Sequence, residues 1–463
     1  MNQNIFRKYD IRGIYGLDLT DELIEQIGRA IGSLIIKNNP EQINQVIAIA
    51  RDARISSPII SDVLIKAISE TGVKIYDLGI SPTPVFYHYV ITNNLQNGII
   101  ITASHNGKEY NGLKLIINGK SYCLENIKEI YDLINQKKFK SQNKKVKIQK
   151  IKTANEKYCN DILERFADRK CNFKKIKIVI DSGNSVASLV APKIFKDLGC
   201  TVMELYSELD GTFPNHSPDT SDLNNLKDLQ KAVINNNADI GFAYDGDADR
   251  LGVVTENGQI IFADKLLMLF AKNLLQEIGN SRILYDVKCT NNLDKLIRKY
   301  GGEPIMCPTG HSIIKNKMRE TEALLAGEMS GHFFFAHNWY GFDDAIYASV
   351  KLLDILSNTQ EYKELNIDTT TVSTPEISIP YPDADKNRLI ENIIKNSKFK
   401  DAKLITIDGL RVEYNDCWGL IRSSNTAPNI TLRFEGDNQQ SLNKIIELFK
   451  SEISKTWPEI KSL

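Results

Sequence analysis

Three segments of the chain repeat one pattern, and this repetition constrains the fold more than any other feature. In each, an apolar strand leads through a polar turn into a helix, and a glycine precedes a second apolar strand; the segments span 46–76, 176–202 and 283–305. Two apolar strands joined by a helix form a βαβ unit, whose strands run parallel. The segments recur roughly every hundred residues, which is the scale of a domain. We therefore expect three related α/β domains with mixed sheets, arranged in series.

Two stretches of unusual composition indicate where domains meet. Residues 137–152 are rich in lysine and predict a solvated connector; an anion-binding patch is the alternative, but the stretch lacks a glycine loop and a pattern of interleaved aromatic residues. Residues 369–382 are rich in threonine and proline, which indicates a linker into a smaller C-terminal α+β domain. A chain of 463 residues is too long for one hydrophobic core. The expected domains are 1–150, 151–256, 257–368 and 369–463.

Composition narrows the classes of function. The chain has 58 Lys and Arg residues and 58 Asp and Glu residues, so no net field attracts nucleic acid or an anionic membrane. Its seven cysteines are scattered and form no C-x-x-C pair, which fits a reduced, cytoplasmic setting without structural zinc. The first residues contain no signal-peptide core, and no stretch is long and apolar enough to span a bilayer. We expect a cytoplasmic protein that binds neither nucleic acid nor membrane.

An acidic run gives the strongest indication of chemistry. In Asp245–Arg250 (DGDADR), three carboxylates alternate with small residues between two strand-like segments. Three such charges repel one another unless a hard cation lies among them, so the run predicts a divalent metal site, with magnesium favoured. A solvated acidic turn is the plainer alternative. A calcium EF-hand also matches the spacing, but Arg250 stands where that loop needs glycine, and the flanks favour strands over helices.

A serine and a lysine lie at the ends of two other predicted strands. Ser104 follows the strand 98–101, where a nucleophile or a phosphate acceptor would lie, although a polar turn is the alternative. His105 is a poor base for Ser104, because adjacent side chains of an extended segment point apart. Lys114 begins the strand 113–117, which could pair back and bring its ammonium near Ser104. An exposed lysine is the plainer interpretation.

Two further polar clusters follow apolar strands in the C-terminal half. In 327–332 (GEMSGH), Glu328, Ser330 and His332 share one face if the segment is extended, and this face suits the recognition of sugar hydroxyls. The run 422–428 (RSSNTAP), with Arg433 on the adjoining strand, supplies groups that bind a phosphate monoester; a polar hairpin is the alternative. Because the four clusters fall in four successive domains, we expect one central cleft where the domains meet.

At these residues the chain resembles the α-D-phosphohexomutase superfamily, in its bacterial phosphomannomutase/phosphoglucomutase branch. The resemblance covers nearly the whole length and also includes 8–13 (KYDIRG), 210–216 (DGTFPNH) and 309–312 (TGHS). It implies four domains around a central cleft. It further implies an enzyme that moves a phosphoryl group reversibly between C1 and C6 of a mannose or glucose phosphate, through a phosphoserine and a bisphosphorylated sugar.

The resemblance implies roles for individual residues. Ser104 would carry the phosphoryl group and, with Asp245, Asp247 and Asp249, would bind Mg²⁺, while hexose 1,6-bisphosphate would act as activator. The other residues implied in catalysis are Arg12, His105, Lys114, Arg250 and His332, with Arg12, Lys114 and His332 as candidates for proton transfer. Those implied in binding the hexose phosphate are Tyr9, Lys288, His311, Glu328, Ser330, Arg422, Ser423, Asn425 and Thr426, to which the residue pattern adds Arg433.

Two residues depart from the family pattern. Gly107 stands where the family usually has proline, which would loosen the serine loop, and Ala248 stands where it usually has glycine, so that a positive φ is disfavoured. Neither change removes a functional side chain, so we expect activity. The alternatives are a phosphoglucosamine mutase, against which Met329 argues, and a non-catalytic sugar-phosphate-binding homologue. The sequence distinguishes neither mannose from glucose nor one oligomeric state from another.

Overall fold

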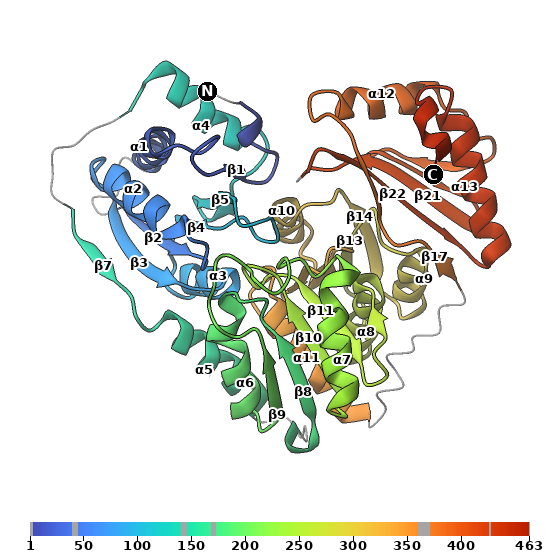
Figure 1. Ribbon diagram of the computed structural model, residues 1–463, viewed down its shortest axis with the longest axis horizontal. Coiled ribbons are helices and arrows are strands. Elements are labelled where there is room, and N and C mark those ends of the chain that lie inside the picture. The colour runs from blue at the N-terminus through green and yellow to red at the C-terminus, as the bar shows by residue number, and fades with distance from the viewer. Residues whose placement is uncertain are drawn as a thin grey trace.

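The computed structural model describes residues 3–38, 45–139, 146–167, 173–359, 371–425 and 427–462 (Figure 1). They form four units in chain order, each built on one β-sheet. The first three sheets mix parallel and antiparallel pairs, and the fourth is antiparallel. The predicted fold class, three related α/β domains followed by an α+β domain, is confirmed. The domain boundaries themselves stay a prediction.

The first domain places helices on both faces of its sheet. Its elements are β1 (Ile11–Ile14), α1 (Asp21–Asn38), β2 (Val46–Arg51), α2 (Ser57–Ser69), β3 (Lys74–Ile80), α3 (Thr83–Thr92), β4 (Gly98–Ile101), β5 (Tyr110–Ile117), β6 (Lys120–Ser121), α4 (Glu125–Gln136) and β7 (Ile148–Lys150). The strand order is β1-β5-β4-β2-β3-β7, with β6 beside β5. Because side chains alternate along a strand, Ile47 and Ile49 of β2 join the core of α1, α2 and α4, while Ala48 and Ala50 join the core of α3.

The second and third domains repeat this plan on smaller sheets, with orders β12-β11-β10-β8-β9 and β14-β13-β15-β16. The elements of the second are α5 (Ala154–Ala167), β8 (Lys177–Asp181), α6 (Ala191–Asp197), β9 (Thr201–Leu205), α7 (Lys227–Asn235), β10 (Ile240–Tyr244), β11 (Leu251–Thr255) and β12 (Ile260–Ile261). Those of the third are α8 (Ala263–Ile278), β13 (Arg282–Asp286), α9 (Asn291–Lys299), β14 (Glu303–Cys307), α10 (His311–Thr321), β15 (Leu325–Gly327), β16 (Phe333–Phe335) and α11 (Ala345–Thr359). The three predicted βαβ units are present, with β2 parallel to β3, β8 to β9 and β13 to β14.

The fourth domain is one antiparallel sheet with two long helices. Its elements are β17 (Val372–Ser373), β18 (Ile377–Pro380), α12 (Lys386–Asn396), β19 (Lys403–Ile405), β20 (Leu410–Glu413), β21 (Cys417–Ser423), β22 (Asn429–Gly436) and α13 (Gln439–Ile453). The expectation of a linker at 369–382 is wrong for its described part, because β17 and β18 both pair with β22. Pro375, Pro380 and Pro382 are tolerated because each ends or follows one of the short strands β17 and β18. At these positions the missing backbone N–H removes no hydrogen bond between strands.

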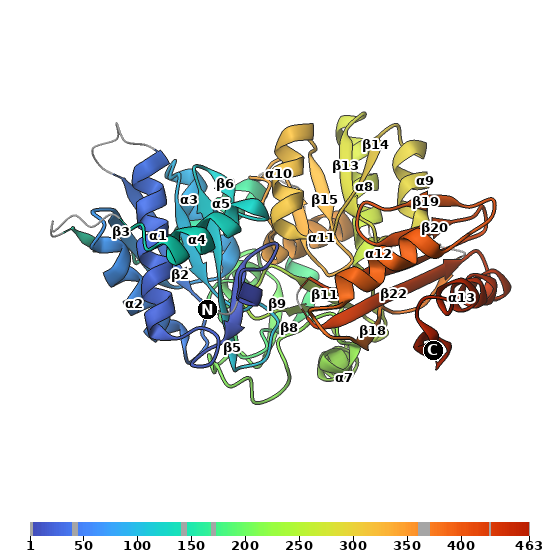
Figure 2. The same ribbon diagram turned by 90° about the horizontal axis from the view of Figure 1, so that it is seen from above.

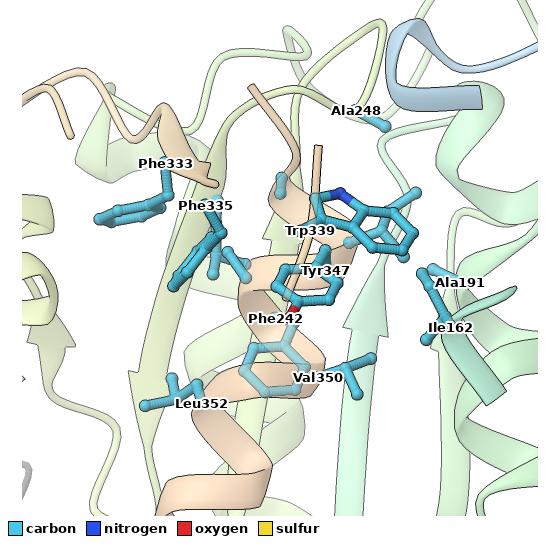
Figure 3. Packing of buried hydrophobic residues seen from close by; sticks show 14 of the residues in the cluster. Ile162, Ala191, Phe242, Ala248, Phe333, Phe335, Trp339, Tyr347, Val350 and Leu352 are labelled. Atoms are coloured by element: carbon cyan, nitrogen blue, oxygen red, sulfur yellow. The ribbon is translucent and has the colours of Figure 1, made fainter. Parts of the chain in front are cut away.

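One hydrophobic core runs through the first three domains, while the fourth has its own. Figure 3 shows part of the shared core, in which Trp339 and Tyr347 stack with ring centroids 4.4 Å apart near Phe242. Figure 2 shows the first domain (blue) and the fourth (red) at opposite ends of the long axis, with the third (yellow) between them. Within the described ranges, no helix is both long and apolar enough to cross a membrane.

Candidate active site

The serine loop follows β4 and places its serine in a left-handed backbone conformation. Ser104 is buried, has a φ of 52° and donates its hydroxyl to Asp245 Oδ2 at 2.7 Å. Its Oγ lies 3.3 Å from His105 Nδ1. The expectation that these neighbours point apart is therefore wrong, because the positive φ breaks the alternation of an extended strand. Burial and the nearby arginines, Arg250 and Arg12, hold the pKa of His105 well below its usual value.

Arg54 fixes the path of the serine loop from the turn after β2. Its guanidinium donates to four backbone carbonyls of the loop, those of Ser104 (2.7 Å), Asn106 (2.7 Å), Gly107 (2.6 Å) and Tyr110 (3.2 Å). Asp52 accepts from Arg54 Nε at 3.0 Å, and their side chains are 1% and 0% exposed respectively. All five N–H donors of the guanidinium are therefore used. The loop is held by this side chain at Gly107, the position where the family usually has proline.

The aspartate loop joins β10 to β11 and packs directly against the serine loop. Asp245, Asp247 and Asp249 are fully buried, and one carboxylate oxygen from each lies within 4.8 Å of the others. A Cβ at Gly246 would lie 2.2 Å from the carbonyl oxygen of Ser104, so only glycine allows this contact. Thr83 fixes the loop from α3, because its N–H donates to Asp247 O at 2.9 Å and its hydroxyl to Asp247 Oδ2 at 2.5 Å.

The donor set of this loop suits a divalent cation. Asp247 Oδ1 is buried and has no hydrogen-bond partner among the described residues. Burial and the charges of Asp249 and Asp247 raise the pKa of Asp245 well above its usual value. Converging carboxylate oxygens are the ligands that Mg²⁺ prefers, and a bound cation would relieve both effects. The residues could therefore hold a metal ion.

Lys114 reaches the same aspartates from β5. As predicted, its strand pairs back on β4, with Lys114 opposite Ile100. Its Nζ lies 2.6 Å from Asp247 Oδ2 and 2.5 Å from Asp249 Oδ2. Burial opposes the charged form, but the two aspartates outweigh it and raise the pKa of Lys114. This lysine is buried rather than exposed, so the plainer interpretation of the sequence does not hold.

His332 connects the aspartate loop with the turn at 327–332. Its Nε2 lies 3.1 Å from Asp249 Oδ1, and its Nδ1 lies 2.7 Å from Glu328 Oε2 and 3.0 Å from Ser330 Oγ. Burial would lower the pKa of His332, but Asp249 and Glu328 outweigh it and raise it to about 9. Burial likewise opposes the charge of Glu328, yet His332 and other donors lower its pKa to about 2. The imidazolium and the carboxylate therefore form a charged pair at neutral pH.

The segment that carries Glu328 is a tight turn, and the prediction of an extended face is wrong. β15 ends at Gly327 and β16 begins at Phe333, while the N–H of Glu328 donates to His332 O at 2.9 Å. Gly331, with φ of 96°, allows the chain to reverse here. The side chains of Glu328, Ser330 and His332 still meet, because the turn gathers them at its tip.

The loop between β21 and β22, which the sequence predicts to bind phosphate, reaches the first domain. Arg422 Nε donates to Asp408 Oδ2 at 2.9 Å, while its Nη2 is buried without a hydrogen-bond partner among the described residues. Asn425 Nδ2 donates to the hydroxyl of Tyr9, which in turn donates to the carbonyl of Thr309. One tyrosine hydroxyl thus joins the first, third and fourth domains.

Other predicted ligands of the phosphate have different partners. Ser423 Oγ donates to Asn387 Oδ1 at 2.8 Å, away from the loop. Arg433 pairs with Asp264 Oδ2 at 2.9 Å and donates to the carbonyl of Lys288, so it joins the fourth domain to the third. Thr426 lies outside the described residues. The phosphate-binding roles of these three residues stay predictions.

A cavity of about 610 Å³ lies where the domains meet. The predicted residues that line it are Tyr9, His105, Arg250, Lys288, His311, Glu328, Ser330, His332, Arg422 and Asn425. Ser104, Lys114 and the three aspartates lie behind this lining, where Ser104 contacts His105 and Asp249 contacts both His332 and Lys114. Arg12 also lies behind it, bound to Asp10 and, at 3.2 Å, to the carbonyl of Ala103. The volume is typical of a site for a small ligand.

Sequence reasoning missed the residues that position the loops. Arg54 and Thr83 bind the serine and aspartate loops, yet each lies in a separate segment with no motif of its own. The available signal was the position of Asp52 and Arg54 at the end of a predicted strand, where a charged pair is exposed or functional.

Family models match the whole organisation of the chain. The models of the phosphoglucomutase/phosphomannomutase family match in order, with the three α/β/α domains at residues 3–141, 156–258 and 262–369, and the C-terminal domain at 376–451. A phosphomannomutase/phosphoglucomutase of Pseudomonas syringae is 42% identical over 462 residues, which covers 98% of this chain and 96% of that protein. A phosphoglucomutase of Neisseria meningitidis is 41% identical over 463 residues, with 98% and 99% covered.

Solved structures agree with this assignment. A phosphoglucomutase/phosphomannomutase family protein of Burkholderia thailandensis superposes with a TM-score of 0.90 at 39% identity, covering 99% of this chain and 98% of that one. Parafusin, a phosphoglucomutase of Paramecium in its open form, shares the fold with a TM-score of 0.76 at 19% identity, covering 97% and 95%. With its four domains, its buried aspartate loop and relatives above 40% identity over the full length, the chain belongs to the phosphoglucomutase/phosphomannomutase family.

Proposed function

We propose that this chain transfers a phosphoryl group reversibly between C1 and C6 of a hexose phosphate, mannose or glucose, through phospho-Ser104 and a bisphosphorylated sugar. One observation carries the proposal: Ser104 donates to Asp245 at 2.7 Å behind one wall of the cavity, while Arg422 and Asn425 line another. Transfer within one sugar phosphate needs a reacting site and a second site for the other phosphate. Hydrolysis needs only the first, so the second site favours a mutase.

Asp245, Asp247 and Asp249, with an oxygen of phospho-Ser104, would hold Mg²⁺. When bound, this ion draws charge from the phosphoryl group and lowers the cost of its transfer. The buried, unpartnered Oδ1 of Asp247 supports the assignment. Lys114 and Arg250, which contact the same carboxylates, would neutralise the charge that remains.

The lining residues would orient the sugar. Glu328 and Ser330 would accept and donate hydrogen bonds to neighbouring hydroxyls, and Arg422, Asn425 and Lys288 would bind the phosphate that does not react. In the first step a base takes the proton of the attacking sugar hydroxyl, the hydroxyl oxygen bonds to phosphorus, the bond from phosphorus to Ser104 Oγ breaks, and the released Oγ takes up a proton. The bisphosphorylated sugar then turns over, and the reverse step returns the other phosphoryl group to Ser104.

The charge states of the histidines suggest their parts in proton transfer. His105 lies 3.3 Å from Ser104 Oγ and stays neutral because its pKa is lowered, so it can accept a proton. His332 is protonated near neutral pH and can donate one. Arg12 and Lys114 remain candidates from the sequence; Arg12 pairs with Asp10, and Lys114 pairs with Asp247 and Asp249. In the first step one group accepts the proton of the sugar hydroxyl and another donates a proton to Ser104 Oγ, and in the reverse step both transfers run backwards.

The test is a coupled mutase assay with Mg²⁺ and a trace of hexose 1,6-bisphosphate. Mannose 1-phosphate, glucose 1-phosphate and glucosamine 1-phosphate are compared as substrates. We expect turnover of the first two and little of the third, and we expect Ser104→Ala to abolish turnover. Ser451→Ala, an exposed serine on α13, is the matched control. A dominant rate with glucosamine 1-phosphate would make the chain a phosphoglucosamine mutase, and ligand binding without any turnover would make it a non-catalytic homologue.

A further inference from the structure

A second cavity, of about 340 Å³, shares no residue with the first. It lies at the carboxyl ends of β2 and β3, where the segment from β7 into α5 passes over them. Its lining consists of Arg51, residues 77–81, residues 150–152, Ala154 and Asn155. The carboxyl ends of parallel strands are where α/β sheets commonly bind ligands.

Arg51 is the unusual residue of this cavity. Its side chain has no hydrogen bond or ion pair within the described part of the chain, although its Nε is buried. Arg51 is half-buried, and no carboxylate among the described residues pairs with it, whereas the fully buried arginines Arg54 and Arg433 form ion pairs with Asp52 and Asp264. A donor that is removed from water and left without an acceptor carries a desolvation cost, and such an atom calls for a ligand or an ordered water.

The other groups of the cavity are mainly basic. Lys150 and Lys152 line it, are exposed to solvent and have no carboxylate partner in the described residues, so with Arg51 they give three positive charges. Asp77 is the opposing charge, and its Oδ1 already accepts from the N–H of Gly79 at 2.9 Å. The cavity therefore holds an excess of positive charge in a partly closed space, where opposite charge is attracted more strongly than at an open surface.

Neutral polar groups complete the lining. Ser81 lines the cavity. Its hydroxyl donates only a long hydrogen bond, of 3.5 Å, to the carbonyl oxygen of Leu78. Asn155, in the first turn of α5, has a buried Oδ1 without a partner among the described residues. A half turn of that amide would present its N–H₂ instead, since the two orientations differ only in hydrogen bonding. Guanidinium, ammonium, hydroxyl and amide donors together are the groups that bind phosphate.

We propose that this cavity, the basic pocket (Arg51, Ser81, Lys150, Lys152 and Asn155), is a second anion site that binds a phosphate dianion, free or as the monoester of a small molecule. The anion accepts from Arg51 Nε, which otherwise stays unpaired, and neutralises the two lysines. The sequence alternative for the lysine-rich stretch, an anion-binding patch, thereby applies to its last residues, which the fold brings to Arg51.

The position of the basic pocket connects it to both catalytic loops. Three residues after Arg51, Arg54 binds the carbonyls of the serine loop. Two residues after Ser81, Thr83 binds Asp247 of the aspartate loop. An anion at the pocket therefore contacts the same two short segments that position Ser104 and the metal-binding carboxylates.

The test is calorimetric titration with inorganic phosphate and, separately, with glycerol 2-phosphate. All proteins carry Arg422→Ala, so that binding at the catalytic cavity is weakened equally. In this background we compare three variants: Arg51→Gln, the double variant Lys150→Ala with Lys152→Ala, and the control Lys147→Ala. Lys147 is exposed, lies just before β7 and does not line the pocket. Thermal melts establish that each variant is folded; if Arg51→Gln is not, the exposed lysine pair carries the test.

We expect binding of phosphate to weaken at least about tenfold in the pocket variants, as loss of a charged hydrogen bond predicts, and to stay unchanged in the control. If the pocket substitutions weaken the binding of inorganic phosphate but not that of glycerol 2-phosphate, free phosphate is the occupant. If the pocket substitutions weaken the binding of both probes, the pocket recognises the phosphate group, whether free or esterified. Equal affinities in the pocket variants and in the Arg422→Ala parent overturn the proposal.

Discussion

At the scale of single residues, the serine loop depends on a side chain that lies outside the cavity. Arg54 donates all five N–H groups, four of them to carbonyls of the loop, and its partner Asp52 is buried with it. Ser104 can therefore keep its left-handed backbone without the proline that the family usually has at position 107. The conformation of Ser104 is set by hydrogen bonds from a neighbouring strand end.

Replacing Arg54 by lysine tests this dependence. Lysine keeps the charge but offers three donors on one atom, so at least two bonds are lost and the fork geometry disappears. We expect kcat to fall about hundredfold, the cost of a small misplacement of reacting groups, with KM nearly unchanged. The coupled mutase assay measures both constants, and mass spectrometry measures the phosphoserine content. Arg298→Lys, on the exposed side of α9, is the control. A lower Tm with unchanged kcat would mean that Arg54 only stabilises the fold.

Asp247 tests the cation site. Its Oδ1 is buried without a hydrogen-bond partner in the described residues, while its Oδ2 binds Thr83 and Lys114. Asp247→Asn keeps the shape and removes one charge, so we expect kcat to fall about 10²–10³-fold, as for the loss of one electrostatic contact in an active site. Thermal melts across a Mg²⁺ titration should show a rise in Tm for the parent and for Asp437→Asn, an exposed control, but not for Asp247→Asn. An equal rise in all three would place the ion elsewhere.

Ala248, which stands where the family usually has glycine, is tolerated because burial of its methyl group offsets part of its backbone strain. The sequence indicates that alanine disfavours a positive φ, yet Ala248 has φ of 64°. The left-handed region costs a residue other than glycine about 1–2 kcal/mol. The methyl is fully buried in the shared core, and burial of one such group contributes about 0.8 kcal/mol. Burial of the methyl offsets only part of this cost, and the remainder is small enough that the loop keeps its shape with alanine.

At the scale of elements, the start of α11 ties the second and third domains together. Asp344 precedes the helix and accepts from the N–H of Tyr347 at 2.8 Å, the hydroxyl of Tyr158 at 2.7 Å and Trp339 Nε1 at 2.9 Å. Tyr158 belongs to α5, so one carboxylate caps a helix and joins two domains. Burial nevertheless raises the pKa of Asp344 to about 7, because it outweighs these donors.

This carboxyl should make stability depend on pH. Its pKa is about 3.9 in the unfolded chain and about 7 in the folded one, so the folded state binds more protons between these values. The stability that protonation contributes is complete below about pH 4 and is lost as the pH rises to about 7. Asp344→Asn keeps the cap but does not titrate, so its free energy of unfolding should vary less with pH in this window. Urea unfolding at several pH values measures the slopes.

A second variant separates titration from structure. Asp344→Ala removes the cap and leaves the donors of Tyr158 and Trp339 unpaired, so we expect a loss of about 2–5 kcal/mol at every pH. Parallel pH profiles for the parent and Asp344→Asn would show that Asp344 does not titrate in this window.

The elements that the sequence predicted correctly are those with a local signal. The strands and helices of the three βαβ units follow from apolar periodicity and from a glycine before the second strand, and all three are present. The errors fall where distant partners decide. Residues 377–380 resemble a linker by composition but form β18 because β22 is available beside them. Residues 328–332 form a turn because β16 pairs back on β15, and no local pattern reveals that register.

The residues of the site divide as the elements do, into those with a local signal in the sequence and those placed by distant partners. Residues inside dense motifs, such as Asp245, Ser104 and Glu328, do come together around one cavity. Arg54 acts on a loop fifty residues away, and only the sheet order, which places β2 beside β4, brings the two together. Contacts of this kind depend on topology, which a single sequence does not display.

At the scale of the whole molecule, the fourth domain is joined to the others less firmly than they are to one another. Its core is separate, and it meets the third domain through a small apolar cluster of Val287, Trp418 and Leu420. Polar bonds surround this cluster, among them those of Arg433 to Asp264 and of Arg411 to the carbonyl of Cys289 at 2.8 Å. An interface of this kind permits the domain to move as a unit, and closing it over the cavity would exclude water from the reaction.

Tyr9 provides the contact that would hold such a closed state. Its hydroxyl accepts from Asn425 of the fourth domain and donates to Thr309 of the third, while its ring lies against Gly310, where a Cβ would meet it at 2.6 Å. Tyr9→Phe keeps the ring and removes both hydrogen bonds, each contributing about 0.5–1.5 kcal/mol. The equilibrium should therefore shift toward an open fourth domain by about 1–3 kcal/mol. If the substrate binds the closed form, KM should rise about tenfold.

Small-angle X-ray scattering and the mutase assay together check this expectation. The radius of gyration of Tyr9→Phe should exceed that of the parent without substrate, and the difference should shrink when hexose phosphate is saturating, because bound substrate favours the closed form. Tyr15→Phe, which removes an exposed hydroxyl bonded to Asp21 at 2.9 Å, makes the same chemical change away from the cavity and should alter neither quantity. If KM rises in Tyr9→Phe while the radius of gyration stays constant, the hydroxyl acts on the substrate directly. If neither changes, the fourth domain closes through its interface with the third domain, and Arg433 and Trp418 become the residues that govern it.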